Sequence, residues 1–146
     1  MSIIKKGDLA PVYVTYGDMI TKEGSSFILP DETLEGFFES YWSYRLNGLA
    51  EKAFLLEVPY FQECVRFTIY ENFINSHVGL SGKGAFRIEI NDVNVLNENL
   101  ISFQIGVFGK VNKSEHLRFY AEDRWVKVRG KWFHILIDPI FFPKLD

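Results

Sequence analysis

The hydrophobic residues of this chain follow two different spacings. Between residues 31 and 77 they recur every three or four positions, whereas from residue 86 onward they alternate with polar residues. The first spacing places apolar side chains on one face of a helix, and the second places them on one face of a strand. The chain is therefore predicted to contain an α+β domain over residues 31–146. Residues 1–30 fit neither spacing well, and we interpret them as an amino-terminal arm that could contain a short strand.

Three helices are predicted in the first half of the chain. Asp31 can cap the first helix, and Asn47 with Gly48 can end it. The apolar stripe of this helix comprises Leu34, Phe37, Phe38, Tyr41, Trp42 and Leu46. A short second helix is expected to end before Pro59, and a third to extend from there to about His77.

The second half is predicted to form a curved antiparallel sheet with one apolar face. The inward positions of its first three strands are Phe86, Ile88, Ile90, Ile101, Phe103, Ile105, Val107, Leu117, Phe119 and Ala121. Polar residues occupy most of the alternate positions, as in strands that are buried on one side only. We therefore expect the amino-terminal helices to pack on the concave, apolar face of this sheet.

The last hairpin requires a choice of register, because a slip of one residue exchanges the two faces of a strand. A two-residue turn would place Arg129 at positive φ, whereas a type I turn closed by Gly130 would not. We therefore expect Lys127 to pair with Lys131. In this register Trp125, Phe133, Ile135 and Ile137 lie on the apolar face, and Arg124, Trp132, His134 and Asp138 lie on the polar face.

Two segments of the chain resemble nuclear transport factor 2-like domains. Residues 41–54, which read YWSYRLNGLAEKAF, and the following PYF at 59–61 are similar to the first helices of that superfamily. Residues 123–134, which read DRWVKVRGKWFH, are similar to its final hairpin. The resemblance covers about residues 31–140 and implies a cystatin-like cone with an apolar pocket and dimerisation through the outer sheet face. Members include isomerases, dehydratases, hydrolases and non-catalytic binding domains, so the fold does not determine the activity.

Composition narrows the class of partner. Hydrophobic residues make up 47% and aromatic residues 16% of the chain, enough for a well-filled core. The formal net charge is -3 without a dense run of Lys or Arg, so we expect no nucleic-acid partner. No segment is long and apolar enough for a membrane span or a signal peptide. The cytoplasm is the expected compartment, although an exported or anchored chain that had lost its leader would look the same.

The pocket implied by the resemblance would be lined by Phe38, Tyr41, Trp42, Tyr60, Phe103, Phe119 and Trp125. Asp123 is the only ionisable residue on the apolar face of the strands in the chosen register. Burial beside Tyr41 or Tyr60 would raise the pKa of Asp123 and suit it to general-base catalysis. We prefer an aspartate at the rim that bonds to the backbone, because a lone acid is a weak indication of a site.

No metal or cofactor is expected. Cys64 is the only cysteine and stands among apolar residues, which predicts a buried, unreactive thiol. The three histidines, His77, His116 and His134, lack the spacing of metal ligands. The glycine-rich segment 79–84 does not match a phosphate-binding loop, and we interpret it as a connector.

The polar face of the sheet is the predicted interface, because it combines aromatic rings with arginines. Its members are Arg87, Gln104, Phe108, Arg118, Tyr120, Arg124, Trp132 and His134. We expect the chain to form a homodimer through this face. The apolar run at 138–143 is expected to pack on its own domain or on a partner subunit.

These observations predict a non-catalytic, homodimeric domain that binds a small apolar ligand or another protein. The alternative is a small isomerase, dehydratase or hydrolase in which Asp123 acts with a tyrosine hydroxyl. An open cavity with Asp123 at its base and a tyrosine within hydrogen-bond reach would favour the enzyme. A cone filled by side chains would disfavour it.

Overall fold

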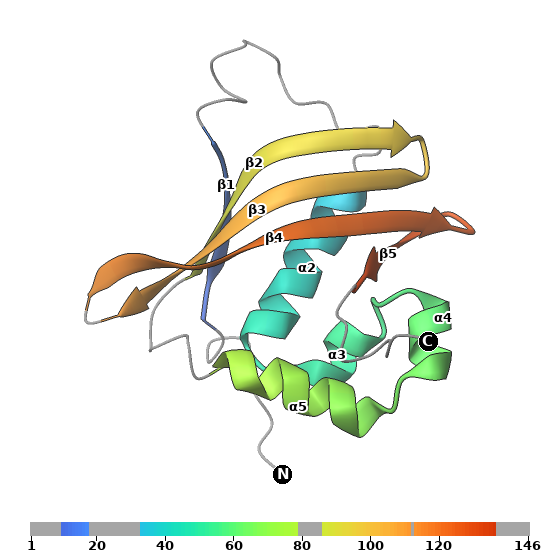
Figure 1. Cartoon of the computed structure of the whole chain (residues 1–146), viewed down its shortest axis with the longest axis horizontal. Coiled ribbons are helices and arrows are strands. Elements are labelled where there is room, and N and C mark those ends of the chain that lie inside the picture. The colour runs from blue at the N-terminus through green and yellow to red at the C-terminus, as the bar shows by residue number, and fades with distance from the viewer. Residues whose placement is uncertain (1–9, 18–32, 79–85, 112, 137–146) are drawn as a thin grey trace, which may run out of the picture.

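The computed structural model describes residues 10–17, 33–78, 86–111 and 113–136. Along the chain its elements are β1 (Val12–Tyr16), α2 (Thr33–Leu46), α3 (Ala50–Phe54), α4 (Pro59–Cys64), α5 (Phe67–Val78), β2 (Phe86–Asn97), β3 (Leu100–Val111), β4 (Ser114–Val128) and β5 (Lys131–Ile135). The protein is α+β, as predicted, and the described helices precede four of the five described strands (Figure 1).

The five strands form one sheet in chain order, from β1 to β5. Strands β2 to β5 are antiparallel neighbours, but β1 runs parallel to β2, with Val12 opposite Phe86. The prediction of a wholly antiparallel sheet is therefore wrong. A short strand separated from its partner by about seventy residues carries no local signal of its pairing direction. Figure 1 shows the long strands β2, β3 and β4 curling together, with α2 across one face of the sheet.

The helices follow the predicted pattern with one exception. Helix α2 ends at Leu46 and is followed by Gly48 at a φ of 76°, a left-handed conformation that favours glycine. The predicted third helix is two helices, α4 and α5. Val65 separates them because its backbone is extended, with φ -111° and ψ 129°, and its side chain is buried.

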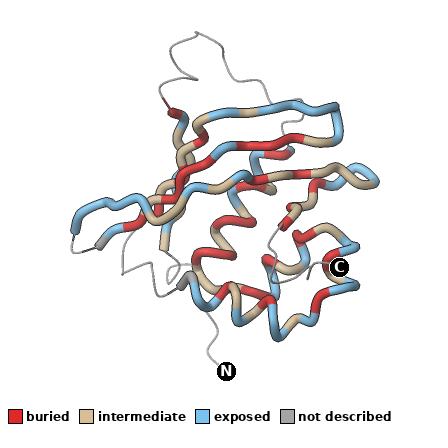
Figure 2. Tube along the Cα trace, in the orientation of Figure 1, coloured by how far each residue is buried: buried red, intermediate tan, exposed pale blue. Residues whose placement is uncertain are grey.

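A single apolar core lies between the helices and the sheet, and Figure 2 shows its buried residues along α2 and the central strands. Its largest members are Tyr41, Trp42, Tyr70, Trp125 and Trp132. The predicted inward positions of β2 and β3 are buried, and Phe119 and Ala121 of β4 pack against them. The alternating pattern therefore identified the correct face for these three strands.

Leu117 is an exception to this pattern. Val107 pairs with Phe119 and Phe108 pairs with Leu117, so Arg118 is an extra residue in β4. Such a bulge shifts the alternation by one position. Leu117 therefore lies on the outer face with 40% of its surface exposed, and its predicted inward position is wrong.

The predicted register of the last hairpin is also wrong. Val128 pairs with Lys131, and the two turn residues Arg129 and Gly130 have φ values of 52° and 79°. A two-residue turn of this type matches the twist of the strands. Its cost at Arg129 is roughly 1–2 kcal/mol, which the burial of Trp132 alone can offset.

The slip exchanges the faces of β5. Trp132 and His134 are buried in the core, whereas Phe133 and Ile135 are only half-buried. The placement of Trp132 and His134 on an exposed interface is therefore wrong. This change brings an ionisable ring under the helices, where the sequence pattern had indicated apolar side chains.

Some predictions fall outside the described residues. They concern the cap at Asp31, the glycine-rich connector at 79–84 and the apolar run at 138–143. Within the part of the chain that is described, no helix has both the length and the apolar character needed to cross a membrane.

Candidate functional site

Three ionisable residues meet beneath the helices. Glu57 follows α3, Asp123 belongs to β4 and His134 belongs to β5, and all three are buried. Nδ1 of His134 lies 2.7 Å from Oε1 of Glu57, and Nε2 lies 2.6 Å from Oδ1 of Asp123. The imidazole is thus held between two carboxylates. The expectation that Asp123 is the only ionisable group on this side of the sheet is wrong.

Backbone pairing brings Glu57 to His134. The N–H of Val58 donates to the carbonyl of His134 at 2.8 Å, and the N–H of His134 donates to the carbonyl of Leu56 at 2.7 Å. The segment between α3 and α4 therefore lies along the edge of β5 and directs the Glu57 side chain inward. Periodicity could not reveal this acid, because Glu57 lies in a connection between two helices.

Two tyrosines complete the surroundings of Glu57. The hydroxyl of Tyr41 donates to Oε2 at 2.6 Å, and the hydroxyl of Tyr70 donates to the same oxygen at 2.7 Å. Tyr41 also stacks on the ring of His134, with centroids 4.1 Å apart. Both carboxylate oxygens of Glu57 therefore have hydrogen-bond donors, as a buried acid requires.

Two tryptophans donate hydrogen bonds to the carboxylate of Asp123. The indole N–H of Trp42 donates to Oδ2 at 3.0 Å, and that of Trp125 donates to Oδ2 at 2.8 Å. The predicted position of Asp123 at an exposed rim is therefore wrong. Its predicted tyrosine partners also differ: Tyr41 bonds to Glu57, and Tyr60 on α4 is 66% exposed.

The pKa values of the site follow from this arrangement. Burial alone would lower the pKa of His134, but the charges of Glu57 and Asp123 raise it to about 9. Burial alone would raise the pKa of Asp123, but the imidazolium and the hydrogen bonds from the two indoles lower it. Near neutral pH, His134 is therefore protonated on both nitrogens and Asp123 is ionised. A raised pKa for Asp123, as catalysis would need, is not found.

Arg45 is a further buried charge. Its guanidinium lies 4.6 Å from the ring centroid of Trp42 and 5.1 Å from that of Phe73. Nη1 donates to the hydroxyl of Tyr41 at 3.2 Å, whereas Nε is buried without a hydrogen-bond partner. Sequence reasoning missed this residue, although helical spacing gives the signal: Arg45 follows Tyr41 by four positions and Trp42 by three.

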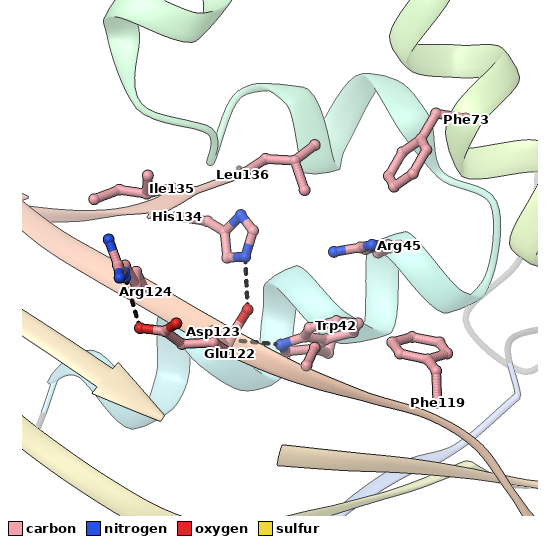
Figure 3. A pocket seen from close by; sticks show the side chains of 11 residues that line it. Trp42, Arg45, Phe73, Phe119, Glu122, Asp123, Arg124, His134, Ile135 and Leu136 are labelled. Carbon is pink, nitrogen blue, oxygen red and sulfur yellow. Dashed lines mark hydrogen bonds and ion pairs between the residues drawn. The ribbon is translucent and has the colours of Figure 1, made fainter. Parts of the chain in front are cut away.

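A pocket of about 460 Å³ opens beside the network. Its lining comes from α2, α5, β4 and the end of β5 (Figure 3). The lining residues are Trp42, Arg45, Phe73, Phe119, Ala121, Glu122, Asp123, Arg124, His134, Ile135 and Leu136. Of the predicted pocket residues, Trp42 and Phe119 are present in this lining. Phe38, Tyr41, Phe103 and Trp125 are instead buried in the core.

The outer sheet face carries most of the predicted interface. Tyr120 is 71% exposed, Gln104 is exposed, and Phe108, Arg118 and Arg124 are partly exposed. Arg87 lies 4.2 Å from the ring centroid of Phe108 and forms ion pairs of 2.8 Å with two glutamates, Glu89 and Glu115. Arg87, Gln104, Phe108, Tyr120 and Arg124 share this face as predicted, whereas Trp132 and His134 do not. Arg118 does not share it either: it is the extra residue of the β4 bulge, and its side chain lies on the side of Gly109 that faces the core residue Phe86.

Two further candidate residues, Cys64 and His116, do not join the network, and the side chain of His77 lies outside the described part of the structure. Cys64 is exposed on α4, so the prediction of a buried thiol is wrong. His116 is exposed on β4. Within the described ranges, no group of three or more acid, histidine or cysteine side chains is arranged to hold a metal ion.

No protein-family model and no curated protein matches the chain. Its fold is similar to that of a SEC-C motif containing protein from Psychrobacter arcticus, with a TM-score of 0.52 and 12% identity over 86% of this chain and 70% of that one. A SEC-C motif containing protein from Rhodopseudomonas palustris gives a TM-score of 0.49 and 8% identity, over 70% of this chain and 74% of that one.

The resemblance to nuclear transport factor 2-like domains is therefore wrong, because the fold is similar to that of the SEC-C motif containing protein from Psychrobacter arcticus. Its motifs amount to aromatic spacing on a helix and a glycine turn between strands, which many unrelated α+β proteins also contain. At 12% identity, the likeness to the Psychrobacter arcticus protein shows the fold alone.

Proposed function

We propose that the protein is a non-catalytic binding domain whose pocket between α2, α5, β4 and β5 holds a small molecule with an apolar body. The observation that carries this proposal is a pocket of about 460 Å³ with aromatic walls and a buried polar floor. This volume lies within the range of small-molecule sites. Trp42, Phe73 and Phe119 supply the apolar walls, and Asp123 with His134 supplies the floor.

The charge states of the floor support binding over catalysis. A general base works best when its pKa is close to the working pH. The pKa of His134 is raised to about 9 and that of Asp123 is lowered, so each is held in its charged form. Moving the proton from His134 would leave two buried carboxylates without their shared cation. The network therefore provides a rigid floor that lowers the cost of ordering the site.

An acid–base enzyme is the second candidate, with an isomerase, dehydratase or hydrolase reaction. It is favoured by one observation: His134 and Asp123 both line the pocket, and Glu57 orients the imidazole from its other side. In that case Asp123 would take the substrate proton. Turnover of any substrate that is abolished by Asp123→Asn, with the fold retained, would establish the enzyme and overturn the binding proposal.

We also propose that the scaffold is a cone of the cystatin-like type and that the protein is cytoplasmic. The protein would form a homodimer or a complex with another protein through the outer sheet face. The exposed ring of Tyr120 and the half-exposed Arg124 support an interface there. Light scattering at micromolar concentration tests the dimer, and a monomer under these conditions would exclude it.

Native mass spectrometry of the purified protein, followed by an NMR screen of apolar fragments, tests the binding proposal. Ala121→Phe should fill the pocket and abolish binding, because Ala121 lies in its lining. Asn94→Phe is the matched control, since it adds the same ring at an exposed position of β2. Loss of binding in both variants, or in neither, would show that the pocket is not the binding site.

A further inference from the structure

Arg45 is a buried cation that the protein itself leaves incompletely paired. Only 6% of its surface is exposed. Among the described residues, its guanidinium makes one hydrogen bond, from Nη1 to Tyr41, and no carboxylate lies within the 4.0 Å of an ion pair. A buried charge of this kind is costly unless it is paired. Glu57 and Asp123 attract this charge from beyond ion-pair distance, but one N–H of the guanidinium stays unsatisfied and is available to an anionic ligand.

The side chain points into the pocket. Figure 3 shows Arg45 reaching from α2 past the ring of Phe73 toward His134 and Leu136. Its guanidinium faces the rings of Trp42 and Phe73, so its position is set by packing as well as by the bond to Tyr41. A molecule in the pocket would therefore meet a fixed donor group rather than a mobile one.

The other charges around the pocket are already engaged. Asp123 accepts bonds from the imidazole and two indoles, and both nitrogens of His134 face carboxylates. At the exposed edge, Nε of Arg124 donates to Glu122 at 2.7 Å. Arg45 is thus the buried lining charge of the described residues that has a donor left for a ligand.

We infer that the pocket selects small molecules that carry a carboxylate on a flat apolar body, with Arg45 binding the carboxylate. This inference rests on the proposed binding function. The planar guanidinium can donate two parallel bonds to a carboxylate. The aromatic lining at Phe73 and Phe119 would hold the apolar body. A phosphate dianion would place a second negative charge beside Asp123, so a monocarboxylate fits better.

The test compares 2-naphthoate with 2-naphthamide, which have the same ring but differ in charge. Titration of the full chain by NMR gives both dissociation constants, and the Nε–H signal of Arg45 reports direct contact. We expect the acid to bind about tenfold or more tightly than the amide, the preference that a charge-assisted pair provides. The acid should also shift the Nε–H signal.

Variants then assign the preference to one side chain. Arg45→Gln should bind acid and amide alike, and Arg45→Lys should retain part of the preference because it keeps the charge. Arg118→Gln removes the same charge from a half-exposed position of β4 outside the pocket lining and should leave the preference intact. Near-UV circular dichroism checks the fold of each variant, and the wild-type comparison needs no variant at all.

The outcomes separate the two proposals. If acid and amide bind equally to the wild-type protein, the inference about the carboxylate is wrong and the binding function stands. A preference that Arg45→Gln keeps in a folded protein also overturns the inference. If neither probe nor any apolar fragment binds, the proposed function itself fails.

Discussion

The two faces of the sheet carry similar charged residues in opposite settings. On the outer face, Arg87 pairs with Glu89 and Glu115, and the side chains in these pairs are 26–41% exposed. On the inner face, His134 pairs with Glu57 and Asp123, and these side chains are at most 3% exposed. Distances are nearly the same on both faces, between 2.6 and 2.8 Å.

Burial determines how much each ion pair contributes to the free energy of unfolding. Water screens an exposed pair, which contributes about 0–1 kcal/mol to stability. Removal of one partner from a buried pair leaves a charge without solvation and costs about 3–5 kcal/mol. The inner cluster should therefore control the stability and shape of the pocket floor, while the outer cluster should be nearly dispensable for folding.

The largest effect is expected for His134→Gln. This change removes the cation between Glu57 and Asp123 and leaves the two acids facing each other through a neutral side chain. The free energy of unfolding should fall by about 3–5 kcal/mol. Urea denaturation measures it, and a loss below about 1 kcal/mol would mean that the network is not charged.

The pH dependence of stability should report the same cation. The pKa of His134 is 6.5 in the unfolded reference and is raised to about 9 in the folded protein. Its stabilising contribution is therefore complete below pH 6.5 and is lost as the pH rises through about 9. The loss should be on the order of 3 kcal/mol. In His134→Gln this part of the pH profile should be flat, and an unchanged profile would contradict the assignment.

Tyr70→Phe should have a smaller effect, because it removes one of the two hydroxyl donors to Oε2 of Glu57 and leaves the other. We expect a loss of about 1–2 kcal/mol in thermal or urea unfolding. Tyr120→Phe is the matched control at an exposed position and should change stability little. Equal losses in both variants would show that burial does not distinguish the two faces.

The smallest effect is expected for Glu115→Gln on the outer face. Arg87 keeps its pair with Glu89, and the lost pair is open to water. The free energy of unfolding should fall by less than about 1 kcal/mol, and by less still in high salt. A loss as large as that of His134→Gln would remove the contrast between the faces.

The sequence predicted most of the fold but little of the site, for physical reasons that differ. Alternating apolar residues identified the inner face of β2 and β3, because a strand that is buried on one side places every second side chain in the core. The register of the last hairpin was predicted wrongly, because local strain at Arg129 disfavours the two-residue turn whereas the burial of Trp132 favours it. That single slip in register concealed His134.

Of the other two charged site residues, one was predictable from the sequence and one was not. Arg45 could have been found from its helical spacing to Tyr41 and Trp42, which places all three on one face. Glu57 could not, because its position depends on backbone pairing between a helix connection and the edge of β5. Tertiary pairing of this kind leaves no periodic trace in a sequence.

The protonation state of His134 tests the central claim most directly. Nitrogen-15 NMR of the imidazole at pH 7 should show both ring nitrogens protonated, with a titration midpoint near pH 9. That result would place a buried cation between Glu57 and Asp123, in a floor built to stay charged. A neutral imidazole at pH 7, with one bare nitrogen, would contradict this account and favour a site that moves protons.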